Sequence, residues 1–158
     1  MKNLTYPILW INESEKNLGI FLNEDQLTSC SPGSQDFFSG LLLCCPDGTM
    51  ISVEKAIKIG RVKTPPDSYI EKILSWVGLG LIRVKLLFKP NKEVIPFADF
   101  VKKVILLLQE DDEKWDSDGE LDLLVENIEA SGSFAQLIEI MKKRCWPNFT
   151  EADGPWYK

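Results

Sequence analysis

The spacing of apolar residues changes near Pro96, and this change constrains the fold more than any other feature. Before Pro96, short apolar segments alternate in polarity with a period of two, as in strands. After it, apolar residues recur about every 3.6 positions, as on a helix face. Because strand-like segments come first and helix-like segments follow, the sequence predicts an α+β fold. We expect a mainly antiparallel sheet within residues 4–90, packed by a helix at 65–77 and by C-terminal helices.

The predicted strands are joined by turn-like stretches. The apolar segments 6–11 and 18–22 flank the polar stretch NESEKN. Segments 40–45 and 50–59 flank Pro46-Asp47-Gly48-Thr49, a sequence typical of a hairpin turn. We predict a loop at 28–36. Two strands are expected to bury one side only: 50–59 through Ile51, Val53, Ile57 and Ile59, and 81–89 through Ile82, Val84, Leu86 and Phe88.

The helical part contains several amphipathic segments. Thr64 is the expected N-cap of the 65–77 helix, and Ser131 or Ser133 that of the last helix. The aromatic residues Trp146, Phe149 and Trp156 of the tail are expected to fold back onto the core. The predicted buried faces after Pro96 are Phe97, Phe100, Val101, Val104, Ile105 and Leu108; Leu121, Leu124, Val125 and Ile128; and Phe134, Leu137, Ile138 and Met141.

Length and composition predict one globular domain, residues 1–158. The chain is 44% hydrophobic and 27% charged, and its longest apolar run, 104–108, is far shorter than the ~20 residues that span a bilayer. We find no signal peptide, so we expect a cytoplasmic protein without a membrane segment. Cys44 or Cys45 is predicted to be a core thiol in a strand. The reactivity of the cysteines stays open for all of Cys30, Cys44, Cys45 and Cys145.

The chain has no histidine, which excludes Ser-His-Asp and Cys-His nucleophilic sites and histidine metal sites. Nucleotide-binding glycine motifs are missing from the sequence, and an EF-hand register centred on Gly119 fails because Lys114 and Val125 replace required carboxylates. A looser metal site around Asp111, Asp112, Asp116 and Asp118 stays open. We predict no cofactor and no enzymatic activity.

The charge of the chain is concentrated in residues 110–129. This segment holds ten carboxylates and one lysine, a net charge of −9, whereas the whole chain carries −6. Cations gather elsewhere in two groups, for which we expect the solvent face of the sheet: Lys55, Lys58, Arg61 and Lys63, and Arg83, Lys85, Lys89 and Lys92. The net charge disfavours direct nucleic-acid binding. The acidic segment is either a solvated connection or a surface that steers a basic protein partner.

Trp115 lies within this run of charges. Its neighbours at helical spacing are Asp111, Asp112, Asp118 and Gly119, so we expect it to be partly exposed, as an interface anchor would be. It could equally fill a gap between two helices. The predicted partner-binding residues are Asp111, Asp112, Glu113, Trp115, Asp116 and Asp118.

Two segments resemble those of bacterial immunity proteins of contact-dependent inhibition and related polymorphic toxin systems. They are GLLLCCPDGTMISVEKA (40–56) and LLLQEDDEKWDSDGELDLLVENIEASGSFAQLIEIM (106–141). The resemblance implies an inhibitor that neutralises one cognate toxin domain, often a nuclease, whose basic groove meets acidic side chains. The alternatives are a structural or regulatory adaptor in a larger assembly and a carboxylate-dependent enzyme.

Overall fold

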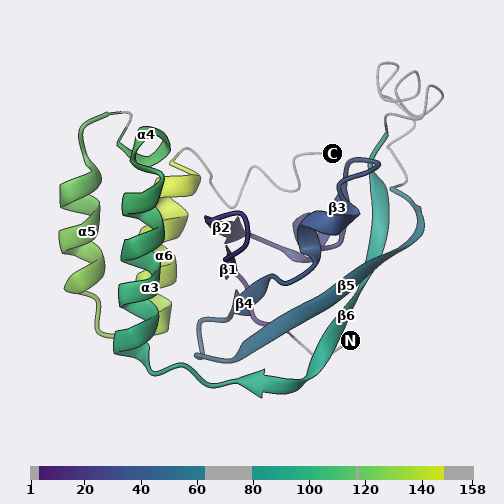
Figure 1. Cartoon of the computed structure of the whole chain (residues 1–158), viewed down its shortest axis with the longest axis horizontal. Helices are drawn as coiled ribbons and strands as arrows, with labels where there is room; N and C mark the ends of the chain where they lie inside the picture. The colour runs from purple at the N-terminus through teal and green to yellow at the C-terminus, as the bar shows by residue number, and fades with distance from the viewer. Residues whose placement is uncertain (1–3, 63–79, 117, 148–158) are drawn as a thin grey trace.

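The computed structural model describes residues 4–62, 80–116 and 118–147, and for residues 91–93 the backbone alone. The described residues form a curled six-stranded antiparallel sheet followed by helices (Figure 1), which confirms the α+β prediction. The predicted 65–77 helix, Lys63, Phe149 and Trp156 lie outside these residues. In sheet order the strands are β2 (Asn17–Phe21), β1 (Ile8–Asn12), β4 (Leu42–Cys44), β5 (Met50–Arg61), β6 (Ile82–Glu93) and β3 (Ser29–Cys30).

The helices lie mainly after the sheet in sequence. Two short elements interrupt the strands: α1 (Glu24–Leu27) and the 3-10 helix η1 (Gln35–Phe38). The region predicted as a loop at 28–36 thus contains β3 and the start of η1, which the short apolar pattern did not indicate. The C-terminal helices are α3 (Phe97–Glu110), α4 (Asp112–Trp115), α5 (Leu121–Glu129) and α6 (Phe134–Cys145). Among the described residues, no helix combines the length and the apolar character needed to cross a membrane.

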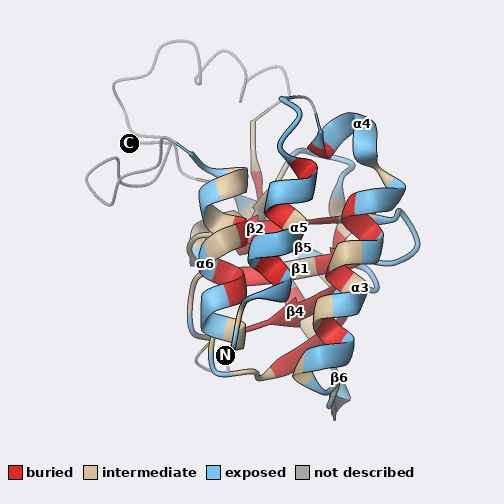
Figure 2. Cartoon of the chain, turned by 90° about the vertical axis from the view of Figure 1, so that its left-hand side faces the viewer, coloured by how far each residue is buried: buried red, intermediate tan, exposed pale blue. Residues whose placement is uncertain are grey.

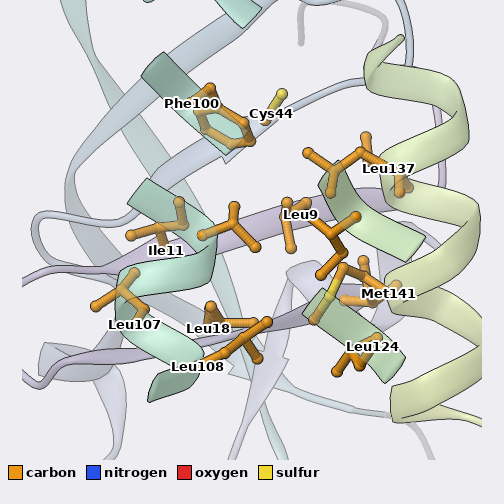
Figure 3. Packing of buried hydrophobic residues seen from close by; sticks show 14 of the residues in the cluster. Leu9, Ile11, Leu18, Cys44, Phe100, Leu107, Leu108, Leu124, Leu137 and Met141 are labelled. Atoms are coloured by element: carbon orange, nitrogen blue, oxygen red, sulfur yellow. The ribbon is translucent and has the colours of Figure 1, made fainter. Parts of the chain in front are cut away.

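Strand β1 separates two hydrophobic cores because successive side chains point to opposite faces of a sheet. Leu9 and Ile11 point to the first core, which α3, α5 and α6 close on one side of β1, β2 and β4 (Figures 2 and 3). Ile8 points to the second core, on the opposite face. The second core also contains Leu27, Phe38, Leu43, Val53, Ile82, Val84 and Leu86.

The predicted hairpin joins β4 to β5, with Leu43 opposite Ile51. Gly48 adopts a φ of +80°, a backbone conformation that favours glycine. Cys44 and Cys45 are both buried, Cys44 in the first core and Cys45 in the second, so the prediction of a core thiol is confirmed. Burial raises the pKa of Cys44 to about 12, with smaller contributions from Cys45 and Asp47.

The long strands β5 and β6 form a ribbon that extends past the helices (Figure 1). The predicted half-burial of β6 is confirmed, because Ile82, Val84 and Leu86 are all buried. In β5 the prediction is wrong: Ser52, on the side expected to face solvent, is 3% exposed, whereas Ile57 is 42% exposed and Ile59 is 60% exposed. The register of this pair shifts between Ile51 and Val53, between Val53 and Lys55, and between Lys58 and Gly60. Each shift interrupts the alternation of the two faces, so the residues after Val53 no longer follow the predicted pattern.

The predicted helix faces after Pro96 pack into the first core. Phe100, Val104 and Leu108 are buried on α3, together with Leu107, which the pattern did not include. The N-cap of α6 is Ser133, which accepts a hydrogen bond from the Gln136 N–H at 3.3 Å. Ser131, the alternative, instead donates its hydroxyl to the Ile128 carbonyl.

Candidate functional site: the acidic connection between α3 and α5

Trp115 is buried, with 7% of its surface exposed, so the expectation of partial exposure is wrong. The helical-neighbour argument fails because α4 spans only Asp112–Trp115, so Asp118 and Gly119 are not on the same helix. The indole instead belongs to the first core, to which β2 contributes Leu18 and Ile20. Trp115 therefore packs the acidic connection against the first core. This placement resembles the alternative interpretation, in which Trp115 fills a gap between two helices.

Arg144, near the end of α6, forms hydrogen bonds with the same acidic connection. Its two terminal nitrogens donate to the Asp118 carboxylate at 2.5 and 2.8 Å, and one also donates to the Trp115 carbonyl at 2.6 Å. Glu120 lies 3.8 Å from the guanidinium. These hydrogen bonds lower the pKa of Asp118 from 3.8 to about 2. Asp118 is thus a charged structural partner of Arg144, which the sequence pattern did not identify.

Other polar contacts fix the remaining parts of the connection. Asp116 accepts a hydrogen bond from the Leu121 N–H at 3.0 Å, at the start of α5. Lys114 donates to the Asn17 side chain of β2 at 2.6 Å, and its ammonium lies 4.9 Å from the centre of the Trp115 ring. Asp111 is half-buried, and its carbonyl accepts from the backbone of Lys114 and Trp115. The connection is consequently anchored to α6, β2 and α5.

Several carboxylates of the acidic segment remain exposed. Asp112 and Glu113 are exposed on α4, as is Asp116 directly after it. Within the part of the chain that the structure describes, these three carboxylates form no ion pair; elsewhere in the segment, Glu110 pairs with Lys16 and Asp118 with Arg144. The six predicted site residues therefore divide into exposed carboxylates (Asp112, Glu113, Asp116), a paired one (Asp118), a half-buried one (Asp111) and a buried anchor (Trp115).

A hollow of about 600 Å³ lies beside the connection, along β2, which is an edge strand of the described sheet. Its lining includes Trp10, Ile20, Trp115 and Trp146. The indole N–H of Trp146 donates to the Ile20 carbonyl at 3.4 Å, but Trp146 is 38% exposed and belongs to neither core, so the expected packing onto the core is wrong for this residue. The edge carries local caps: Asn17 accepts from the Leu18 N–H, and Gln26 accepts from the Leu22 N–H. Side chains that occupy edge groups in this way oppose the addition of another strand.

A second hollow of about 540 Å³ lies between α5 and α6 and includes Asp118, Glu120 and Arg144. Among the residues that the structure describes, no three cysteine or carboxylate side chains gather closely enough to hold a metal ion. The open question of a metal at Asp111, Asp112, Asp116 and Asp118 therefore finds no supporting cluster among them. The described cysteines are free thiols.

Comparisons with protein-family models, curated proteins and solved structures give no match.

Proposed function

We propose that this protein is a binding protein of the immunity type, an inhibitor that neutralises a basic toxin domain through the surface of α4. The observation that carries the proposal is the set of exposed carboxylates Asp112, Glu113 and Asp116 on a firmly anchored element. A cluster of one charge sign raises the association rate with an oppositely charged partner and fixes its orientation.

The anchoring of this surface supports the proposal. The buried Trp115 side chain packs α4 onto the first core, and Arg144 donates hydrogen bonds to the Trp115 carbonyl and to Asp118. A surface whose geometry is set before binding loses less conformational entropy on association. In this proposal Trp115 is a positioning residue, and the carboxylates on either side of it contact the partner.

The carboxylate-dependent enzyme is less well supported than the binder. The hollow between α5 and α6 contains Asp118 and Glu120, but Asp118 is paired with Arg144 and its lowered pKa keeps it ionised. A general acid needs the opposite shift of its pKa. Among the described residues, the lining of the larger hollow contains no carboxylate. As for an adaptor that uses the sheet edge, the capped N–H groups of Leu18 and Leu22 oppose strand addition at β2.

The decisive experiment purifies the product of the open reading frame next to this gene and measures its binding to the purified chain. Asp112→Lys with Glu113→Lys should reduce the association rate at least tenfold. It should change the thermal melt little, because both side chains are exposed and the Asp112 carboxylate accepts only from the adjacent Glu113 N–H. Asp116 is left intact, since its carboxylate accepts from the backbone of α5.

The matched control is Asp36→Lys with Glu54→Lys, which changes the net charge equally at exposed positions on η1 and β5. It should bind almost as the wild type does. Equal losses in the two variants would mean that net charge alone matters, and the α4 assignment would be wrong. Absence of any complex with the neighbouring protein would contradict the inhibitor role.

A further inference from the structure

The described helices cover only part of one sheet face, and the β5–β6 ribbon continues that face beyond them. Pairing places Lys55 opposite Leu87 and Ile57 opposite Lys85, so these four residues share one face of the ribbon. The other face carries Ala56 opposite Leu86, which packs toward the second core. Lys89 shares the first face because its neighbour Phe88 points to the second core. We call Lys55, Ile57, Lys85, Leu87 and Lys89 the ribbon face.

The ribbon face combines cations with accessible apolar surface. Lys55, Lys85 and Lys89 are exposed, Ile57 is 42% exposed and Leu87 is half-buried. Within the described chain these three lysines form no ion pair, in contrast to Arg83, which binds Asp25 at 3.1 Å. A sheet face of this kind usually packs against another layer of structure.

The outer face of α5 has the complementary composition. Leu123 is 56% exposed, with the exposed carboxylates Asp122 and Glu126 beside it. The helix turns its opposite side, Leu121, Leu124 and Ile128, into the first core, so the outer face points away from the molecule (Figure 2). Acidic groups around an exposed leucine thus match lysines around an exposed isoleucine in both charge and apolar character.

We infer that the ribbon face is a self-association surface, and that its occupant is the outer face of α5 from a second copy of this chain. The docked helix would extend the helical layer over the uncovered part of the sheet. The two surfaces lie toward opposite ends of the long axis (Figure 1), so one pair of contacts leaves a free surface at each end. Such a contact is head-to-tail and builds closed rings or open chains of molecules, depending on the rotation between successive copies. The inference goes beyond the proposed function and uses α5 instead of α4.

Sedimentation of the full chain tests this surface. The wild type should sediment above the monomer mass of 18.0 kDa as its concentration rises from about 10 µM to about 1 mM in about 0.05 M salt. It should return to the monomer in about 0.5 M salt, where exposed charges are screened within a few ångströms. A wild type that stays monomeric at low salt over this range overturns the inference.

Two variants identify the surfaces. Lys55→Glu with Lys85→Glu removes the ribbon face, and Asp122→Lys with Glu126→Lys removes the acidic helix face; each alone should be monomeric. Their mixture should associate, because the intact α5 of the first variant fits the intact ribbon of the second. A mixture that stays monomeric, or a variant that associates alone as the wild type does, overturns the head-to-tail contact.

The charge control is Glu15→Lys with Asp36→Lys, which should associate as the wild type does. Thermal melts of all variants confirm folding, since every substituted side chain is exposed. The outcome is separable from that of the proposed function, because Asp112 and Glu113 remain unchanged in these proteins. Loss of self-association with intact partner binding, or the reverse, distinguishes the two surfaces.

Discussion

Trp115 and Lys114 are adjacent in the chain and lie in opposite environments. The indole is buried in the first core, whereas the Lys114 ammonium reaches Asn17 across the surface of β2. A short helix that presents one side chain inward and its neighbours outward explains both positions. The acidic character of this segment therefore coexists with a hydrophobic anchor, and the two properties can be separated by mutation.

At the residue scale, Trp115→Ala should lower the free energy of unfolding by roughly 3–5 kcal/mol, the cost of a large cavity in a packed core. The measurement is a urea titration followed by circular dichroism. Leu123→Ala, at a side chain that is 56% exposed, is the control and should change stability by less than about 0.5 kcal/mol. Similar small effects in both variants would contradict the anchoring role of Trp115.

A second prediction at this scale concerns Gly48. A Cβ atom there would lie 2.8 Å from Cδ2 of Phe134, whose ring is held by Phe97 and Phe100 at centroid distances of 4.9 and 5.6 Å. Gly48→Ala should therefore cost about 2–4 kcal/mol, from the positive φ and from overpacking.

Gly33 provides the matched control for this substitution. Its φ of +88° is similar, but a Cβ atom there would meet nothing within 4 Å. Gly33→Ala should cost only about 1 kcal/mol in the same urea titration. Equal losses at the two positions would show that backbone strain alone acts and that the hairpin turn does not press against α6.

At the scale of elements, Arg144 links α6 to the connection before α5. Arg144→Ala removes the donor to the Trp115 carbonyl, and this hydrogen bond contributes about 1 kcal/mol. The variant should melt at a lower temperature, and amide exchange should accelerate in α4 more than in α3. Arg144→Lys is the comparison, because a lysine keeps the charge and loses the paired donors. A lysine variant as stable as the wild type would contradict the bidentate role.

The same pair makes a prediction about pH. The pKa of Asp118 falls from 3.8 to about 2 in the folded protein, so the folded state favours the ionised carboxylate. Its contribution to stability is fully present above pH 3.8 and is lost as the pH falls toward 2. Thermal melts of wild type and Asp118→Asn should therefore differ at neutral pH and converge near pH 2. A difference in melting temperature that persists unchanged at pH 2 would rule out this linkage.

Local patterns predicted most elements and failed where burial depends on distant segments. The alternation in β6 and the helical spacing around Phe100 give the right faces, because each repeats over several turns or residue pairs. Ile57 follows the same pattern as Ile51, yet register shifts after Ile51 and Val53 turn it to the face opposite the second core, where it is 42% exposed. Arg144 and Asp118 are separated by 26 residues, so their pairing depends on how α6 packs and has no local signal.

At the scale of the molecule, strands β1 and β4 connect the two cores, because each strand contributes side chains to both. Leu9 of β1 lies in the first core and pairs with Cys44, while the preceding residue, Ile8, lies in the second. The β4 strand alternates in the same way, with Leu43 in the second core between Leu42 and Cys44 in the first. A substitution that weakens the packing of one core must therefore also disturb strands that line the other core.

This coupling predicts a single cooperative unfolding transition, as expected for one domain. Leu9→Ala and Leu43→Ala, each at a fully buried side chain in a different core, should each cost about 2–5 kcal/mol. Native-state hydrogen exchange measures the free energy of opening at each amide. This free energy should fall equally at Val104 in the first core and Val84 in the second, whichever leucine is changed. If Leu43→Ala accelerated exchange at Val84 and left Val104 protected, the two cores would unfold separately. The chain would then consist of two units instead of one, because β1 and β4 would no longer transmit the loss across the sheet.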